Sequence, residues 1–250
     1  MTYLRRKIDA FLEQWKSDSG KKPLVVKGPR QVGKTESIRR FGFANYDSVI
    51  EINFVEEPKY KSIIEDGYSA ASIVRNISLL DPAKRFVEGR TLLFFDELQE
   101  FPEIATALKF FKQDARFDVI CSGSMLGISY QRIESNSVGH KTDFEMRSLD
   151  FEEFLWAKGY DDSIVDEMLT HLIEARPFTN VQHKALMDVF LDYCALGGMP
   201  DVVRSYIDRN TFEGSLQTQR QLVLDYREDI QKYAEGLDKG RILNVFNHIP

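Results

Sequence analysis

The stretch Gly28–Thr35, which reads GPRQVGKT, constrains the fold of this chain more than any other feature of its sequence. It follows the short apolar run LVVK and precedes residues 34–42, whose pattern predicts a helix. Two glycines separated by four residues and followed by lysine and threonine are typical of a loop that binds phosphate groups. A glycine turn with a solvated lysine is the alternative, but the flanking strand and helix patterns disfavour it.

The chemistry of phosphate binding explains this pattern. Phosphates require many hydrogen-bond donors at short range, and backbone N–H groups supply them where glycines such as Gly28 and Gly33 let the loop approach closely. The positive end of the following helix dipole points to the same place. Lys34 adds a charge for the β- and γ-phosphates, and Thr35 offers a hydroxyl to Mg²⁺. The predicted nucleotide-binding residues are Gly28, Pro29, Arg30, Gln31, Val32, Gly33, Lys34, Thr35 and Glu36.

An acidic pair, Asp96 and Glu97, ends the apolar stretch TLLFFDE. If this stretch is a strand of a parallel sheet, the pair lies at the carboxyl end, where ligands bind in such sheets. Asp96 is then predicted to bind Mg²⁺ through its water shell. Glu97 is predicted to orient a water molecule for attack on the γ-phosphorus. The alternative is that Glu97 only stabilises the start of a helix.

A second polar strand end, in the sequence ICSGS, supplies Ser122 and Ser124. Either hydroxyl is a candidate to contact the γ-phosphate or the attacking water, unless the segment is a simple loop of small residues. Asn53, at the end of VIEIN, is a weaker candidate. The predicted catalytic residues are Lys34, Glu97, Ser122 and Ser124, and the predicted metal ligands are Thr35 and Asp96.

Strand and helix patterns alternate over the first 150 residues. Residues 3–17 and EIATALKFFKQ each predict a helix, and residues 56–88 are expected to be mostly helical with breaks near Gly67 and near Asp81-Pro82. Strands are predicted at LVVKG, VIEINF, TLLFFDE and DVICSGS, with a fifth at residues 143–149. Such alternation is typical of an α/β fold with a parallel sheet and helices on both faces.

The strand pattern stops near residue 150, and four helical segments follow: FEEFLWAKG, SIVDEMLTHLIEA, QHKALMDVFLDYCALGG and TQRQLVLDYREDIQKYAEGL. The sequence GGMP at Gly197–Pro200 predicts the end of one helix and a proline start of the next. The expected organisation is therefore an α/β domain over residues 1–150 and a helical domain over residues 151–250.

Composition disfavours several other classes of protein. The net charge of −6 argues mildly against non-specific binding to DNA or RNA, which requires a basic face. No apolar run approaches 18 residues, and the first residues lack the apolar centre of a signal peptide, so we expect no membrane span and a cytoplasmic location. The two cysteines and four histidines show no spacing typical of a zinc site.

The motifs GPRQVGKT, LLFFDELQ and CSGS, followed by SLDFEEFL and YCALGGMPDVV, resemble those of prokaryotic AAA-type ATPases of the AAA+ superfamily with a DUF4143 C-terminal region. The resemblance covers residues 3–250. It implies a P-loop NTPase core with strand order 5-1-4-3-2, then a helical and winged-helix-like region. Gly28–Thr35 would match Walker A, Asp96 and Glu97 Walker B, and Ser122 or Ser124 the sensor position. Members usually extend well beyond 250 residues, so we expect this chain to be truncated.

One segment departs from the family pattern. Members often carry Gly-Arg before the stretch that here reads SLDFEEF, whereas this chain has His140 and Lys141 at that place. An arginine that stabilises transition-state charge contributes about 10³–10⁵ in rate where it is present. Lys141 or Arg147 takes this role, or the chain lacks it, and the sequence does not decide between them.

Together these features predict a Mg²⁺-dependent ATPase that acts as a conformational switch on a protein or nucleic-acid partner, with ATP and Mg²⁺ as cofactors. Two alternatives remain open. The first is an ATP-binding regulatory module with little turnover. The second is a phosphotransferase that acts on a small molecule, and the acidic pair disfavours this second alternative. The sequence identifies neither the partner nor the oligomeric state.

Overall fold

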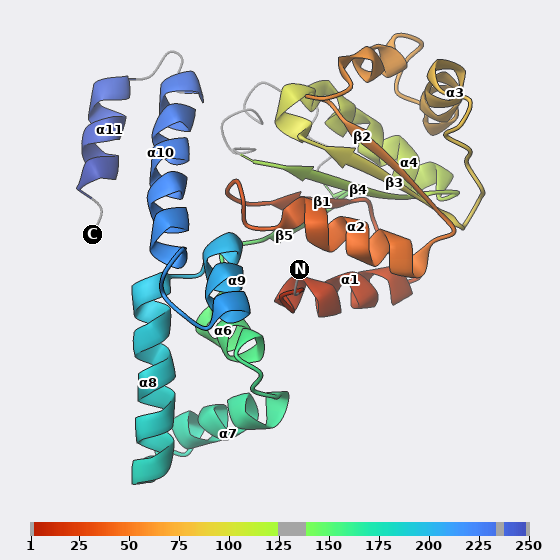
Figure 1. The fold of residues 1–250 in the computed structure, drawn as a ribbon. Coiled ribbons are helices and arrows are strands. Elements are labelled where there is room, and N and C mark those ends of the chain that lie inside the picture. Colours follow the sequence, from red (N-terminus) through yellow and green to blue (C-terminus); the bar gives the residue numbers. More distant parts are fainter. Residues whose placement is uncertain (1–2, 125–138, 234–237, 249–250) are drawn as a thin grey trace. The chain divides into compact units, whose positions relative to one another are not determined.

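The computed structural model describes residues 3–124, 139–233 and 238–248, and the chain forms two compact units (Figure 1). One unit comprises Arg5–Ser148, and the other comprises Leu149–Pro250 together with Met1–Leu4. The first unit contains the sheet and the second is helical.

The first unit is built on a five-stranded sheet in the order β2-β3-β4-β1-β5. Every neighbouring pair of strands is parallel, and read from the β5 edge the order is 5-1-4-3-2, which confirms the predicted P-loop NTPase fold. The strands are β1 (Leu24–Lys27), β2 (Ser48–Asn53), β3 (Thr91–Asp96), β4 (Asp118–Gly123) and β5 (Thr142–Glu145).

The helices of this unit differ in part from the predicted ones. They are α1 (Lys7–Ser17), α2 (Lys34–Asn45), α3 (Ala70–Leu80) and α4 (Leu108–Asp114), with short 3-10 helices η1 (Pro58–Ile64), η2 (Leu98–Glu100) and η3 (Pro102–Ala107). The segment EIATALKFFKQ is thus a 3-10 turn followed by a short α-helix. The predicted break near Asp81-Pro82 is confirmed: helix α3 stops at Asp81, which is extended because the following Pro82 disfavours the helical backbone there.

The fifth strand is shorter than predicted. Among the described residues it pairs only with β1, and the four residues of β1 match Thr142–Glu145 one to one. The backbone beyond Glu145 turns away after one more bond, from Met146 N–H to Lys27 O at 2.7 Å. Strand pairing therefore ends where β1 becomes the glycine loop.

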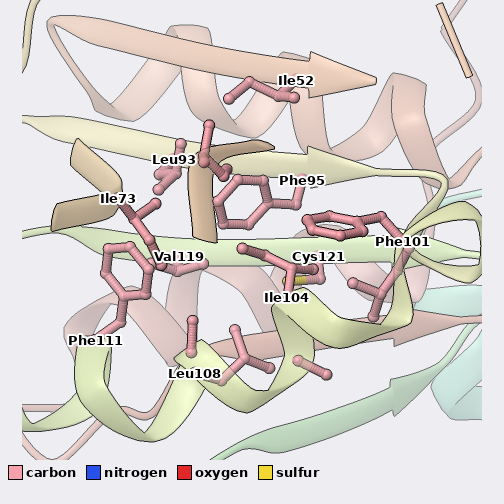
Figure 2. Packing of buried hydrophobic residues seen from close by; sticks show 14 of the residues in the cluster. Ile52, Ile73, Leu93, Phe95, Phe101, Ile104, Leu108, Phe111, Val119 and Cys121 are labelled. Carbon is pink, nitrogen blue, oxygen red and sulfur yellow. The ribbon is translucent and has the colours of Figure 1, made fainter. Parts of the chain in front are cut away.

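Both faces of the sheet are covered, since all six residues of β3 are buried. On one face Phe95, Val119 and Cys121 pack against Ile73 of α3, Ile104 of η3 and Phe111 of α4 (Figure 2). On the other face α2 packs so closely that a methyl group at Gly42 would lie 3.0 Å from side-chain atoms of Leu92 and Val49. The strand ends are thereby fixed between two packed layers.

The second unit contains only helices among its described residues: α6 (Phe151–Ala157), α7 (Asp162–Ile173), α8 (Asn180–Leu196), α9 (Pro200–Arg209), α10 (Ser215–Tyr233) and α11 (Lys239–Asn247). The family resemblance implied a helical and winged-helix-like region here. The described residues of this unit contain the helices but no strand of a wing. None of the helices that the structure describes is long and apolar enough to cross a membrane.

The GGMP segment joins α8 and α9 as expected. Gly197 ends α8 with a φ of 68°, and Pro200 is at the start of α9. Gly198 allows a close backbone approach, because a methyl group there would lie 2.0 Å from Leu149 O. Leu149 N–H donates to Gly198 O at 2.7 Å, so this turn is hydrogen-bonded to the residue just before Asp150, the N-cap of α6.

Candidate active site

The glycine loop between β1 and α2 has the backbone that a phosphate-binding loop requires. A methyl group at Gly28 would lie 1.9 Å from Met146 O, so only glycine fits where β1 leaves the sheet. Gly33, with φ of 93° and ψ of 18°, immediately precedes α2 in the left-handed region. The two glycines of the motif therefore meet different requirements: Gly28 lies close to the backbone of Met146, and Gly33 has a left-handed conformation.

Lys34, the first residue of α2, lies inside this loop. It is 8% exposed, and its ammonium donates to Gly28 O at 2.9 Å and to Pro29 O at 2.6 Å. Burial lowers the pKa of Lys34, while the carboxylates of Glu97 and Asp96 act in the opposite direction. A cation held by two loop carbonyls can exchange them for phosphate oxygens.

Asp96, the last residue of β3, accepts several hydrogen bonds at the carboxyl ends of the strands. It is 3% exposed and accepts hydrogen bonds from Thr35 Oγ1 at 3.1 Å, from Ser122 Oγ and from Glu97 N–H at 3.0 Å. Asn53 Nδ2 lies 3.5 Å from the same carboxylate. Burial raises the pKa of Asp96, although the bonds from Ser122 and Thr35 oppose the effect.

Sheet register explains why residues so far apart in sequence meet here. Asn53 is opposite Asp96 in the pairing of β2 with β3, and β4 and β1 lie next in the sheet. Because all these strands are parallel, their carboxyl ends share one edge with the glycine loop. The structure therefore brings Thr35, Asp96 and Ser122 into one hydrogen-bonded group.

Glu97 follows Asp96 with a left-handed backbone, φ 57° and ψ 48°. It precedes η2, but its side chain makes no capping hydrogen bond, which disfavours a helix-start role. Its carboxylate accepts from Gln99 Nε2, and Gln99 Oε1 accepts from Ser124 N–H at 3.1 Å. Gln99 was not among the predicted site residues; the only signal for it was its place in the motif LLFFDELQ.

The two serines differ in their surroundings. Ser122 is fully buried and donates to Asp96, so its hydroxyl supports the carboxylate. Ser124 is 2% exposed, and its hydroxyl has no hydrogen-bond partner among the described residues. Of the two, Ser124 has the hydroxyl that can still engage a ligand.

The other loop residues lie around this centre. Pro29, Gln31 and Glu36 are exposed, and Arg30 is half-buried. Val32 is buried, and its carbonyl accepts from Arg6 Nη1 at 2.7 Å. The exposed residues therefore lie on the solvent side of the loop, and Val32 lies on its buried side.

Arg6 is a second residue that sequence reasoning missed. Besides Val32 O, its guanidinium donates to Arg147 O at 2.6 Å, and it is 5% exposed. It therefore ties the glycine loop to the segment that follows β5. Two arginines at the start of a charged helix predict exposed side chains, so nothing in the sequence indicated that Arg6 is buried and bonded to two backbone carbonyls.

The two residues proposed from the sequence as a charge-stabilising cation, Lys141 and Arg147, lie at opposite ends of β5. Lys141 precedes the strand and is paired with Asp143 at 2.5 Å, at the sheet edge away from the loop. Arg147 follows the strand and is paired with Glu145 at 3.1 Å, with both side chains largely exposed. Arg147 is thus the one on the side of the glycine loop.

The donor set suits Mg²⁺. A buried carboxylate and a neighbouring hydroxyl are hard oxygen ligands, and Mg²⁺ commonly takes only one or two protein ligands beside water and phosphate oxygens. Within the described residues no group of three or more His, Cys, Asp or Glu side chains is arranged to hold a metal ion. Thr35 and Asp96 therefore fit a metal that a bound nucleotide helps to coordinate.

A family model described as "AAA domain" matches residues 20–155, more than half of the chain. The chain therefore belongs to this family, and its fold is that of an AAA+ P-loop ATPase, a class of nucleotide-binding proteins. No protein of curated function matches the sequence.

Three solved structures are similar to parts of the chain. A variant of Thermotoga maritima RuvB has 16% identity and a TM-score of 0.38, with 62% of this chain and 49% of that one covered. C. elegans PCH-2 has 12% identity and a TM-score of 0.35, with coverages of 69% and 47%. Drosophila ORC bound to DNA has 13% identity and a TM-score of 0.43, with coverages of 96% and 66%. The chain spans about half the length of the first two, and likenesses this distant carry no information on its activity.

Proposed function

We propose that this chain hydrolyses ATP with Mg²⁺ and acts in the cytoplasm as a conformational switch on a protein or nucleic-acid partner, as its resemblance to the DUF4143-containing ATPases implies. One observation carries the proposal: the Asp96 carboxylate lies 3.1 Å from the Thr35 hydroxyl, beside the glycine loop and directly before Glu97. That grouping unites a phosphate loop, a metal-binding pair and a second carboxylate at one edge of the sheet.

The proposed roles follow from the contacts. Thr35 and Asp96 would hold Mg²⁺, which when bound neutralises charge on the β- and γ-phosphates. Loop N–H groups and the Lys34 ammonium stabilise phosphate charge, with Lys34 leaving the carbonyls of Gly28 and Pro29 to do so. Glu97 orients and polarises the attacking water, and the Ser124 hydroxyl, which is buried and bonds no described residue, contacts the γ-phosphate or that water.

The test compares the wild-type chain with Glu97→Gln. Calorimetry with MgATP measures binding, and continuous phosphate release measures turnover. We expect both proteins to bind within a few-fold of each other and the variant to lose at least about 10²-fold in kcat, as for removal of a general base. Equal, measurable rates in both proteins would contradict the role of Glu97, and near-zero phosphate release from the wild-type chain with intact binding would contradict the proposed hydrolysis.

A binding module with little turnover is the second candidate, and one observation favours it. Both residues that stand near the family arginine position are engaged in ion pairs, Lys141 with Asp143 and Arg147 with Glu145. This candidate predicts tight MgATP binding with near-zero phosphate release in wild type and Glu97→Gln alike. Repeating the assay with DNA, and with proteins recovered on the immobilised chain, tests whether a partner restores turnover.

A further inference from the structure

Gln99 connects two functional strand ends through a single side chain. Its Nε2 donates to the Glu97 carboxylate at the end of β3, and its Oε1 accepts from the N–H of Ser124, one residue beyond β4. The side chain is half-buried in the first unit, next to the fully buried Leu98. One amide therefore spans the acidic pair and the strand that carries both serines.

The orientation of this amide is fixed by chemistry. A backbone N–H can only donate, so the atom of Gln99 that faces Ser124 must be the carbonyl oxygen. The remaining NH₂ group then faces Glu97, whose ionised carboxylate can only accept. Each half of the amide has one suitable partner, and exchanging oxygen and nitrogen would oppose like groups at both ends.

The backbone holds Gln99 in place for this contact. The left-handed conformation of Glu97 reverses the chain after β3, and Glu100 N–H donates to Glu97 O at 2.9 Å to close the η2 turn. Leu98 anchors the turn in the hydrophobic core. The Gln99 side chain is thereby directed back over the carboxylate two residues before it.

We propose that Gln99 is a positioning residue that holds the Glu97 carboxylate in the orientation required for water attack and links that orientation to the end of β4. The inference rests on the proposed ATP hydrolysis and extends it to a residue outside the predicted site. One carboxylate oxygen of Glu97 is held by the amide, which leaves the other to accept from water. Ser124, which bonds the same amide, has a buried hydroxyl that no described group engages.

Two substitutions at Gln99 separate its two hydrogen bonds. Gln99→Glu keeps the acceptor for Ser124 N–H but replaces the donor to Glu97 with a second carboxylate, whereas Gln99→Ala removes both. Gln113→Ala, at an exposed position of α4, is the matched control. Thermal melts establish that all variants are folded, calorimetry measures MgATP binding, and multiple- and single-turnover phosphate release measures the chemical step.

We expect both Gln99 variants to lose about 10²-fold in kcat, the scale of a misplaced catalytic group, while MgATP affinity changes less than about threefold. In a Glu97→Gln background Gln99→Ala should change the single-turnover rate less than about twofold, because the carboxylate that it positions is absent. Gln113→Ala should resemble the wild type.

The outcomes distinguish this inference from the proposed function. If wild type turns over and Gln99→Glu is as active as wild type, Gln99 only fastens η2 to β4 and the inference is wrong while the hydrolysis stands. A loss from Gln99→Ala that persists in the Glu97→Gln background leads to the same conclusion. If the wild-type chain binds MgATP but never releases phosphate, the proposed function fails, and the positioning role fails with it.

Discussion

Gly28→Ala tests the link between the glycine motif and the sheet. A methyl group at this position would lie 1.9 Å from Met146 O and 3.0 Å from Met146 C, both of which are backbone atoms. Contacts below 3.0 Å are essentially never seen for a Cβ atom, so the loop and the segment after β5 must separate by at least 1.1 Å, the difference between 3.0 and 1.9 Å. No side-chain rotation relieves this clash.

The cost follows from what must move. Met146 N–H donates to Lys27 O at 2.7 Å, and this last bond between β5 and β1 is strained or lost when the two backbones separate. Losing it costs about 0.5–1.5 kcal/mol, and overpacking costs about 1–3 kcal/mol. The expected loss in the free energy of unfolding is therefore about 1.5–4.5 kcal/mol.

Urea unfolding measures this loss, with Gly67→Ala as the matched control. Gly67 has a φ of +99°, but a methyl group there meets nothing within 4 Å, so this variant bears only the strain of a left-handed residue, about 1 kcal/mol. Gly28→Ala should also weaken MgATP binding, whereas Gly67→Ala should not. If the two variants lose equal stability, the close approach at Met146 does not constrain the loop and the reasoning is refuted.

Three further predictions concern the charged groups around the loop. Lys34→Ala should weaken MgATP binding at least about 10²-fold by calorimetry, since it removes the buried ammonium, and unchanged affinity would rule out the loop assignment. Burial raises the pKa of Asp96, so the folded state binds this proton more tightly than the unfolded chain. Without ligand, the contribution of Asp96 to the free energy of unfolding should decline as pH rises above the pKa of this carboxyl in the unfolded chain, about 4. Asp96→Asn should flatten this decline in urea titrations over a series of pH values, and an unaltered slope would contradict it. Arg6→Met leaves two carbonyls without their buried donor and should lower the free energy of unfolding by roughly 2–4 kcal/mol. The control Arg5→Met, at an exposed position, should lower it by less than about 0.5 kcal/mol. Equal losses would contradict the role of the two hydrogen bonds from Arg6.

The fold was predictable because its signals are local and mutually consistent. An apolar stretch, a glycine loop and a helix recur in the order that a parallel sheet requires, and the motif resemblance supplied the strand order that the structure confirms. Boundaries were less predictable where tertiary pairing sets them. β5 ends at Glu145 because its partner strand, β1, ends there, and no pattern within residues 143–149 carries that information.

The candidate site was predictable in its residue types but not in its connections. The positions of Thr35, Asp96 and Ser122 at one edge follow from parallel strands, and the structure joins them by hydrogen bonds. The contact of Gln99 with Glu97 depends on a left-handed backbone at a glutamate, which sequence does not indicate. The role of Arg6 was not predictable for a different reason. Its partners are backbone carbonyls, which every residue type carries, so no residue in the sequence marks them.

Hydrolysis in ¹⁸O-labelled water tests the central claim most directly, because the claim is that water bound near Glu97 attacks the γ-phosphorus of a nucleotide held in the glycine loop. Incubating the wild-type chain with MgATP should release inorganic phosphate beyond one equivalent per chain. Each phosphate should carry at least one labelled oxygen, and the Lys34→Ala chain should release none above background. Tight MgATP binding without labelled phosphate, or recovery of the γ-phosphate on another acceptor, would contradict the account.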